Sequence, residues 1–216
     1  DEVWHPTPQK FDFFYTVSYW VAVLSLIGAL IISFGDVTPL VVRSGTLDTK
    51  MLRWQKVIGD LVFTAAVYLT YFQIINVRND SHGTAYLFPR EPGTRQRVGA
   101  AAVIGTIAYL VGMLIWDFGA IMEIINNAVE FTVVADYLLL RLPSFVGGTG
   151  FLVGGVCEVA QNYGKSLREV ETWASLLNAV GGLLFMLGGL FGFFDQLSLT
   201  SSTCFGIGII MYVVTS

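Results

Sequence analysis

The sequence has few charged residues and few of the side chains that build catalytic or metal sites. Only 13% of its 216 residues are charged, whereas an ordinary soluble domain carries about 25%. Its two histidines lie outside the long apolar runs, and its two cysteines, Cys157 and Cys204, are far apart in the chain. These absences argue against haem held between membrane helices and against a zinc or redox cysteine pair.

The chain also lacks a charge pattern that would attract nucleic acid and a catalytic motif. Its net charge is -4, from 12 basic and 16 acidic residues without a long run of either sign, so nucleic acid is not an expected partner. The glycine-rich stretch 148–155 is not followed by the Lys-Ser or Lys-Thr of a phosphate-binding loop. No nucleophile stands with a neighbouring base. We therefore expect a protein that is not an enzyme, and the sequence assigns no cofactor to it.

The sequence does contain long hydrophobic runs. Hydrophobic residues make up 54% of the chain, and runs of about twenty residues without an ionisable side chain are long enough to cross a bilayer as helices. The sequence predicts an all-α fold, a polytopic transmembrane helical bundle that forms one domain surrounded by the lipid bilayer. The expected spans are 13–35, 57–77, 98–127, 143–163, 172–194 and 202–214. The last span is short, so five spans are the alternative to six.

Residues 128–142 separate the third and fourth expected spans. Their mixture of acidic, basic and apolar side chains is typical of a segment that lies in the membrane interface. Pro143 then predicts the start of a new helix. Counting Lys and Arg in the expected loops gives seven on the side of the N-terminus and five on the other side, which favours an N-terminus on the inside.

The fourth and fifth spans resemble each other. At an offset of 34 residues, four glycines and a phenylalanine of 146–155 coincide with those of 180–189. Small residues seven positions apart recur in the other spans, and such pairs share one helix face, where a neighbouring backbone can approach closely. The predicted packing residues are Gly28, Gly35, Gly105, Gly112, Gly148, Gly155, Gly182 and Gly189. The pattern indicates duplicated helical hairpins, and a face that receives a flat ligand or a partner helix is the alternative.

Two short motifs near the C-terminus carry a resemblance to a known family. Residues 178–189 contain Gly-x-x-Phe-x-x-Gly, and residues 202–208 contain Phe-x-x-Gly. This last third of the chain resembles the YrhK-like membrane hairpin, an uncharacterised family, although Gly189 stands where a serine is expected. The resemblance implies a helical membrane hairpin and no particular reaction.

Acidic and amide side chains near the span ends are the candidate ligand-binding residues. A charged group at the centre of a membrane helix costs about 2.5 to 3.5 kcal/mol, and we expect Asp60 to avoid this cost near an interface. The candidates, expected to converge where the third and fourth spans end, are Asp117, Glu123, Asn126, Glu158, Gln161 and Asn162. Together they could bind a cation, relay protons or ligate a pigment magnesium, and polar pairing between helices produces the same pattern.

Three functions fit these features. The leading hypothesis is a non-catalytic accessory or scaffold subunit that packs with other membrane-protein subunits, because small-residue faces and short loops dominate the chain. The rival is a small ion or solute transporter that uses the acid and amide cluster, since internal repeats often frame a site at the membrane midplane. The third is a pigment- or quinone-binding subunit of an energy-converting membrane.

Overall fold

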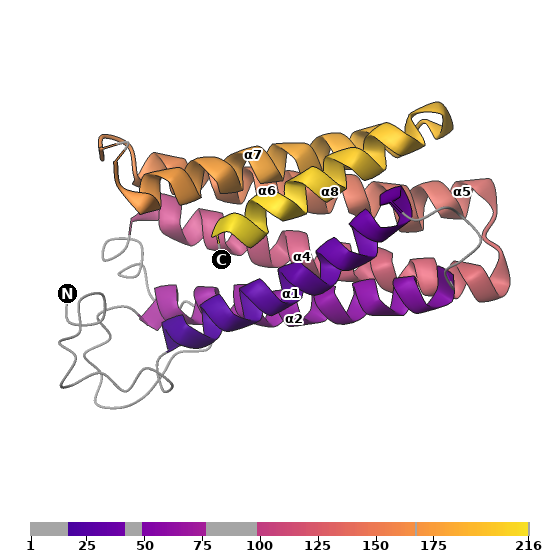
Figure 1. Cartoon of the computed structure of the whole chain (residues 1–216), viewed down its shortest axis with the longest axis horizontal. Helices are drawn as coiled ribbons and strands as arrows, with labels where there is room; N and C mark the ends of the chain where they lie inside the picture. Colours follow the sequence, from indigo (N-terminus) through magenta and orange to yellow (C-terminus); the bar gives the residue numbers. More distant parts are fainter. Residues whose placement is uncertain (1–16, 42–48, 77–98, 167, 216) are drawn as a thin grey trace.

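The computed structural model describes residues 17–41, 49–76, 99–166 and 168–215, and within these ranges it contains helices and no strand (Figure 1). The elements are α1 (Val17–Val41), α2 (Thr49–Asn76), α4 (Ala100–Val129), α5 (Val133–Asp136), the π-helical turn η2 (Tyr137–Arg141), α6 (Leu142–Gln161), α7 (Val170–Phe191), the 3-10 turn η3 (Asp195–Leu197) and α8 (Ser198–Thr215). Six helical runs in this described part are long and apolar enough to cross a membrane. The protein is therefore a multi-pass integral membrane protein with an all-α bundle, as the sequence predicts.

The last run decides between five and six spans. Together, η3 and α8 give 21 residues of mean hydropathy 1.7, from Asp195 to Thr215, which is long enough to cross the hydrocarbon core.

The edges of three predicted spans, residues 13–16, 77 and 98, lie outside the described residues, as do the loops at 1–16, 42–48 and 77–98 that enter the prediction of membrane orientation.

The fourth membrane helix does not begin at Pro143. The Thr132 side chain caps a helix that starts at Val133, and the π-helical turn over 137–141 joins this start to α6 without a break. A π-helical turn interrupts the regular ladder of hydrogen bonds just where proline offers no N–H, so the helix passes Pro143. The predicted restart at Pro143 is therefore wrong, whereas the predicted interfacial position of 128–142 stays a prediction.

The helices form a closed ring in which chain order is also spatial order. Each helix packs against the next one, through α1, α2, α4, α6, α7 and α8, and α8 returns to pack against α1. In Figure 1, α6 and α7 lie along one side of the bundle and α1 and α2 along the other, with α4 and α8 between them. Such a ring has an inner face around its long axis and an outer face towards lipid.

Glycines on α6 and α7 face each other's backbone in reciprocal pairs. A Cβ on Gly148 would lie 2.6 Å from the carbonyl carbon of Phe185, and one on Gly182 would lie 2.6 Å from that of Phe151. Likewise, a Cβ on Gly155 would lie 2.5 Å from Ala179 Cα, and one on Gly189 would lie 2.5 Å from Phe145 Cα. In both cases, adding 34 to the number of the α6 residue and subtracting 34 from that of the α7 residue turns one contact into the other. A two-fold axis perpendicular to the antiparallel helices therefore relates α6 to α7.

The same two-fold relation extends to the flanking helices. On α6, Gly147 faces the Trp116 ring and Gly154 faces the Tyr109 ring of α4. On α7, the equivalent glycines, Gly181 and Gly188, face the Tyr212 and Phe205 rings of α8. A shift of 96 positions therefore carries α4 onto α8.

A third pair of helices completes the pattern. Gly28 of α1 meets Phe63 of α2, and Gly59 of α2 meets Ile32 of α1, so a shift of 31 positions carries α1 onto α2. The chain thus contains two halves of opposite orientation, α2–α4–α6 and α1–α8–α7. Because α4 and α6 correspond to α8 and α7 in reverse chain order, the symmetry is not that of the predicted hairpins repeated in tandem.

The remaining predicted small residues also lie in the interior, and large side chains lie outside. Gly105 faces Cys157 Cβ, Gly112 faces the carbonyl oxygen of Gly147, and Gly35 is buried in α1. Each helix of the ring exposes large apolar side chains, among them Leu30, Leu61, Leu114, Val156, Val180 and Ile210. In water these side chains would be an unusually extensive apolar surface, whereas in lipid they are solvated.

We expect alanine at Gly148 or Gly182 to destabilise the bundle by about 1 to 3 kcal/mol, because the added carbon meets backbone that cannot move aside. Thermal unfolding in mild detergent measures the effect. Gly192→Ala is the matched control, since Gly192 has φ -61° and its added Cβ would have no neighbour closer than 3.3 Å. Equal melting temperatures for the three variants would contradict this account of the packing.

Candidate functional site

Aromatic side chains fill the middle of the ring. Phe151 and Phe185 pack edge to face with ring centroids 5.3 Å apart, and Trp116, Phe63 and Tyr212 pack against one or both of them. Together with Tyr109, Met113, Ile32, Ala29 and Ile209 they form the buried core. We call Phe151 and Phe185, with the rings around them, the central plug.

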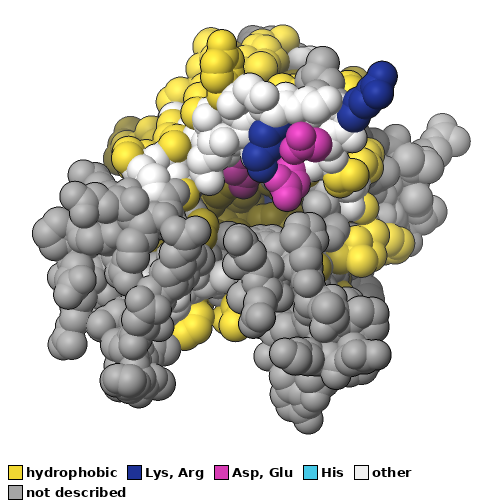
Figure 2. Space-filling view, turned by 90° about the vertical axis from the view of Figure 1, so that its left-hand side faces the viewer, with side chains coloured by type: hydrophobic (Ala, Val, Ile, Leu, Met, Phe, Trp, Pro, Cys, Tyr) yellow, Lys and Arg dark blue, Asp and Glu magenta, His cyan; other side chains and the backbone are white. Residues whose placement is uncertain are grey.

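A cavity of about 330 Å³ opens on one side of the plug, at the end of the bundle where α4 begins and α6 ends. We call this end the Glu158 end. All six long helices contribute to the cavity, with Phe63, Tyr109, Phe151 and Tyr212 among its lining residues. Figure 2 looks onto this end and shows a hollow with acidic and basic side chains at its upper edge and apolar side chains deeper inside.

A hydrogen-bonded chain holds Glu158 in this cavity. Asn178 of α7 donates from Nδ2 to a Glu158 carboxylate oxygen at 2.8 Å, and its own Oδ1 accepts from Thr215 Oγ1 at 2.7 Å. Tyr212 donates to the Asn178 carbonyl oxygen at 3.2 Å. The carboxylate of α6 is therefore positioned by α7 and α8, and all four residues line the same cavity.

A second cavity, of about 290 Å³, opens at the opposite end. We call this end the Arg141 end. Its charged lining residues are Arg53, Lys56, Glu123 and Arg141. Arg53 Nε lies 3.5 Å from Glu123 Oε1, and Lys56 Nζ lies 6.0 Å from the centre of the Trp116 ring.

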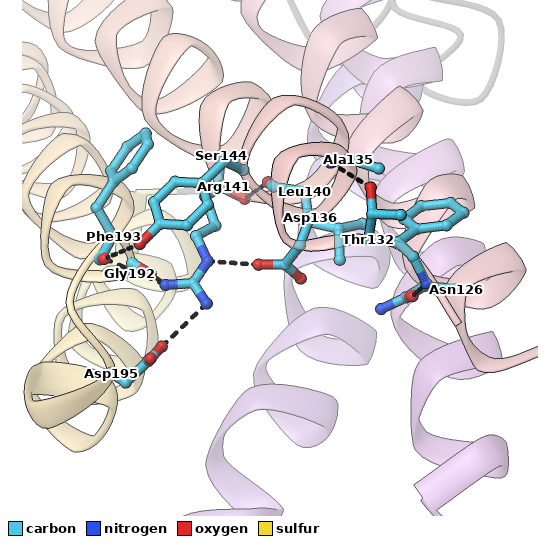
Figure 3. Close-up of polar contacts among 12 residues, drawn as sticks. Asn126, Thr132, Ala135, Asp136, Leu140, Arg141, Ser144, Gly192, Phe193 and Asp195 are labelled. Atoms are coloured by element: carbon cyan, nitrogen blue, oxygen red, sulfur yellow. Dashed lines mark hydrogen bonds and ion pairs between the residues drawn. The ribbon is translucent and has the colours of Figure 1, made fainter. Parts of the chain in front are cut away.

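Arg141 ties together the segments that meet at this end. Its guanidinium donates to Asp136 at 2.6 Å and to the carbonyl oxygens of Gly192 and Phe193 at 3.0 and 3.1 Å, and it lies 2.9 Å from a carboxylate oxygen of Asp195 (Figure 3). The π-helical turn that carries Arg141 is thus joined to the turn between α7 and α8. Both of its acidic partners lie at the edge of the bundle, so the arginine charge is balanced locally.

The two-fold relation carries one cavity onto the other. Tyr109 and Tyr212 at the Glu158 end correspond to Phe205 and Trp116 at the Arg141 end, and Asn178 corresponds to Ser144. The further corresponding pairs are Ala22 with Arg53, Ser25 with Lys56, Thr215 with Gly119, and Glu158 with Gly192. The cavities are therefore two symmetry-related copies of one feature of the fold. They lie along the long axis of the ring, on opposite sides of the central plug, and their charged residues differ.

Two carboxylates lie between the cavities. Asp60 is 1% exposed and contacts a small void of about 20 Å³ against Phe63, Phe151 and Phe185. Asp117 is 7% exposed and accepts a hydrogen bond of 2.7 Å from Thr64. Both lie well inside their helices, so the predicted position of Asp60 near an interface is wrong.

The predicted acid and amide cluster is divided between the two ends. Because α4 and α6 are antiparallel, their C-terminal ends lie on opposite sides of the membrane, and the prediction that they converge is wrong. Glu123 and Asn126 line the cavity at the Arg141 end, Glu158 lines the one at the Glu158 end, and Asp117 lines neither.

The three predicted amides make local contacts. Asn126 Oδ1 accepts from the backbone N–H of Phe131, which stabilises the turn after α4. Gln161 donates to the Cys157 carbonyl oxygen, and Asn162 donates to the Glu171 carbonyl oxygen in the loop before α7. Their hydrogen bonds make Asn126, Gln161 and Asn162 elements of helix ends and turns.

The sequence-based hypothesis missed several cavity residues. Asn178 and Thr215 are single polar residues in apolar runs, and Tyr109 and Tyr212 look like ordinary core or interface aromatics in the sequence. The equal spacing of Tyr109 with Trp116 and of Phe205 with Tyr212, seven residues in each case, is a signal for the two tyrosines alone, and it does not show that they meet Asn178 and Thr215.

Comparisons with protein-family models, with curated proteins and with solved structures found no match. The resemblance of the last third of the chain to the YrhK-like hairpin therefore stays a prediction.

We expect Arg141→Met to destabilise the turn between α7 and α8 by about 2 kcal/mol, because it removes charge-assisted hydrogen bonds to two carbonyl oxygens. Hydrogen exchange followed by mass spectrometry should show faster exchange over residues 192–199. Arg168→Met is the control, since Arg168 is exposed in the loop at the other end. Unchanged exchange in the Arg141 variant would contradict the role given to this side chain.

Proposed function

We propose that this protein is a non-catalytic transporter that moves a small solute across the membrane along the axis of the helix ring. The observation that carries the proposal is the pair of cavities related by the two-fold axis, one at each end of the bundle and both closed by the same central plug. A solute in the cavity at the Glu158 end reaches Phe151, and one in the cavity at the Arg141 end reaches Trp116, and both rings belong to the central plug.

Inverted halves provide a physical route for alternating access. When two halves have the same fold in opposite orientations, each half can adopt the conformation of the other, and the exchange turns a site that is open on one side into a site open on the other. Here the halves are α2–α4–α6 and α1–α8–α7. Exchange between them would widen one cavity while it narrows its symmetry mate.

The interfaces between the halves suit such a movement. The halves meet at α6–α7 and α1–α2, and glycines lie at both contacts: Gly148 and Gly182 meet the backbone of the facing helix, and Gly28 and Gly59 meet Phe63 and Ile32. Where a glycine meets backbone, as on α6 and α7, no side chain at that point has to separate before the helices can tilt. Gly148 and Gly182 thus favour both close packing and small rotations.

The accessory-subunit role stays a prediction. Its support is the apolar outer surface of the ring, and lipid covers such a surface equally well. The axial cavities favour transport, because a scaffold that acts through its outer face has no need of polar chambers on its axis. Pigment or quinone binding would use the same cavity, and an absorption spectrum of the purified protein tests it directly.

We expect Glu158→Gln to lower solute uptake into proteoliposomes by about tenfold, because it removes the charged group of one cavity and retains its shape. Uptake of radiolabelled rubidium ion, choline and glycerol is measured in parallel with the unmodified protein. Glu169→Gln is the matched control, since Glu169 is exposed at the same end and does not line the cavity. If unmodified protein takes up none of the three solutes faster than empty vesicles, the transport proposal fails in this form.

The plug generates a separate expectation. Phe151→Ala combined with Phe185→Ala should let solute leak down its gradient, because these rings separate the two cavities. The readout is passive efflux from loaded proteoliposomes, with Phe194→Ala as a control at an exposed position. A double variant that folds, as judged by size-exclusion chromatography, and is as tight as the unmodified protein would contradict the role of the plug.

A further inference from the structure

The cavity at the Glu158 end contains one carboxyl side chain and, among the described residues that line it, no basic one. Among the described residues that line this cavity, Glu158 is the only ionisable acid, and none is Lys, Arg or His. Its hydrogen-bond partner Asn178 is neutral. Charges held inside a membrane protein are paired as a rule, because an isolated charge in a medium of low dielectric constant is costly. A positively charged ligand would pair with Glu158 in this cavity.

The same cavity presents several aromatic rings. Tyr109, Phe151, Tyr212 and Phe63 all line it. Tyr109 and Phe151 meet at 68° with ring centroids 5.7 Å apart, and Phe151 and Tyr212 meet at 76° with centroids 5.5 Å apart. These rings pack edge to face with one another and line the cavity together, and clustered aromatic rings of this kind bind quaternary and methylated ammonium groups through cation–π interactions.

The Tyr109 hydroxyl is a buried polar group beside the acid of this cavity. Tyr109 is 9% exposed, and among the described residues its hydroxyl has no hydrogen bond of standard geometry, although the Glu158 carboxylate and the Tyr212 hydroxyl are close enough to interact with it. Buried polar groups are normally hydrogen-bonded, so an N–H or O–H group of a ligand in the cavity would join a polar group already formed by Glu158 and the two tyrosine hydroxyls.

We propose that the cavity at the Glu158 end binds a small organic cation of the ammonium class, with Glu158 as its counter-ion and the rings of Tyr109, Phe151 and Tyr212 around its alkyl groups. The cavity volume of about 330 Å³ is at the small end of the range for ligand sites, which limits the cation to a compact amine. The inference rests on the proposed transport function for the movement of this ligand, and binding itself is measured separately.

The test compares two probes that differ in charge and little in shape. Choline and its neutral carbon isostere, 3,3-dimethylbutan-1-ol, are titrated into the detergent-solubilised full chain, and the melting temperature is followed, since a ligand that binds the folded state raises it. Choline is expected to raise the melting temperature with dose, and the isostere is not. An equal response to both probes, or a response to sodium chloride as large as that to choline chloride, overturns the ammonium class.

Variants assign the binding to this cavity. Glu158→Gln should weaken choline binding by about tenfold or more, and Glu169→Gln at the same end should leave it unchanged. Tyr109→Leu, which removes a ring, should weaken binding of tetramethylammonium by about fivefold, and Tyr109→Phe, which keeps the ring, should restore it. Unaltered binding in both Glu158→Gln and Tyr109→Leu, each with a melting temperature near that of the unmodified protein, overturns the site.

Uptake into proteoliposomes separates this inference from the proposed function. Choline binding without choline uptake supports the ligand class and contradicts transport. Uptake of glycerol or rubidium ion without choline binding supports transport and contradicts the ligand class.

Discussion

The structure depends on how closely its helices approach where side chains are missing. Between lipid-exposed helices the hydrophobic effect supplies little attraction, so packing contacts and hydrogen bonds determine which helices associate. On α6 and α7, adjacent glycines face two different neighbours: Gly148 and Gly182 face each other's helix, while Gly147 and Gly181 face aromatic rings of α4 and α8. Each of these helices can therefore pack closely on two sides, which a ring of six helices requires.

The ring in turn separates two chemistries. Large apolar side chains occupy the outside, and the polar groups collect on the axis, where each end has its own cavity. The two-fold relation gives both ends the same arrangement of helix backbones, but their charged residues differ. Glu158 corresponds to Gly192, Lys56 to Ser25, and the buried Asp60 to Ala29. Backbone packing is thus shared between the halves, and the charges that would select and move a solute are not.

The sequence predicts the helical bundle well because a bilayer demands long uncharged runs, and η3 with α8 extends the short last run to a full span. The offset of 34 residues seen in the sequence is also the offset that relates the contacts of α6 and α7. The composition of 128–142 led to the wrong prediction that a helix starts at Pro143, because a π-helical turn lets the helix continue past this proline. Glu123 and Glu158 were grouped by composition, although antiparallel spans place them at opposite ends. The cavity depends on Tyr109, Asn178 and Tyr212 from three helices, and no local pattern reveals their meeting.

Cysteine accessibility tests most directly whether the ring encloses two aqueous chambers separated by a plug. In a background with Cys157→Ala and Cys204→Ala, single variants at Ser25→Cys, Ser144→Cys, Met113→Cys and Leu114→Cys are treated in proteoliposomes with a charged, membrane-impermeant thiol reagent from one side or the other. The account predicts that Ser25→Cys reacts from one side and Ser144→Cys from the opposite side, because they line opposite cavities. Cysteine at Met113 in the core and at Leu114 on the outer surface should stay unmodified. Equal reactivity at all four positions, or modification of Ser25→Cys and Ser144→Cys from the same side only, would contradict it.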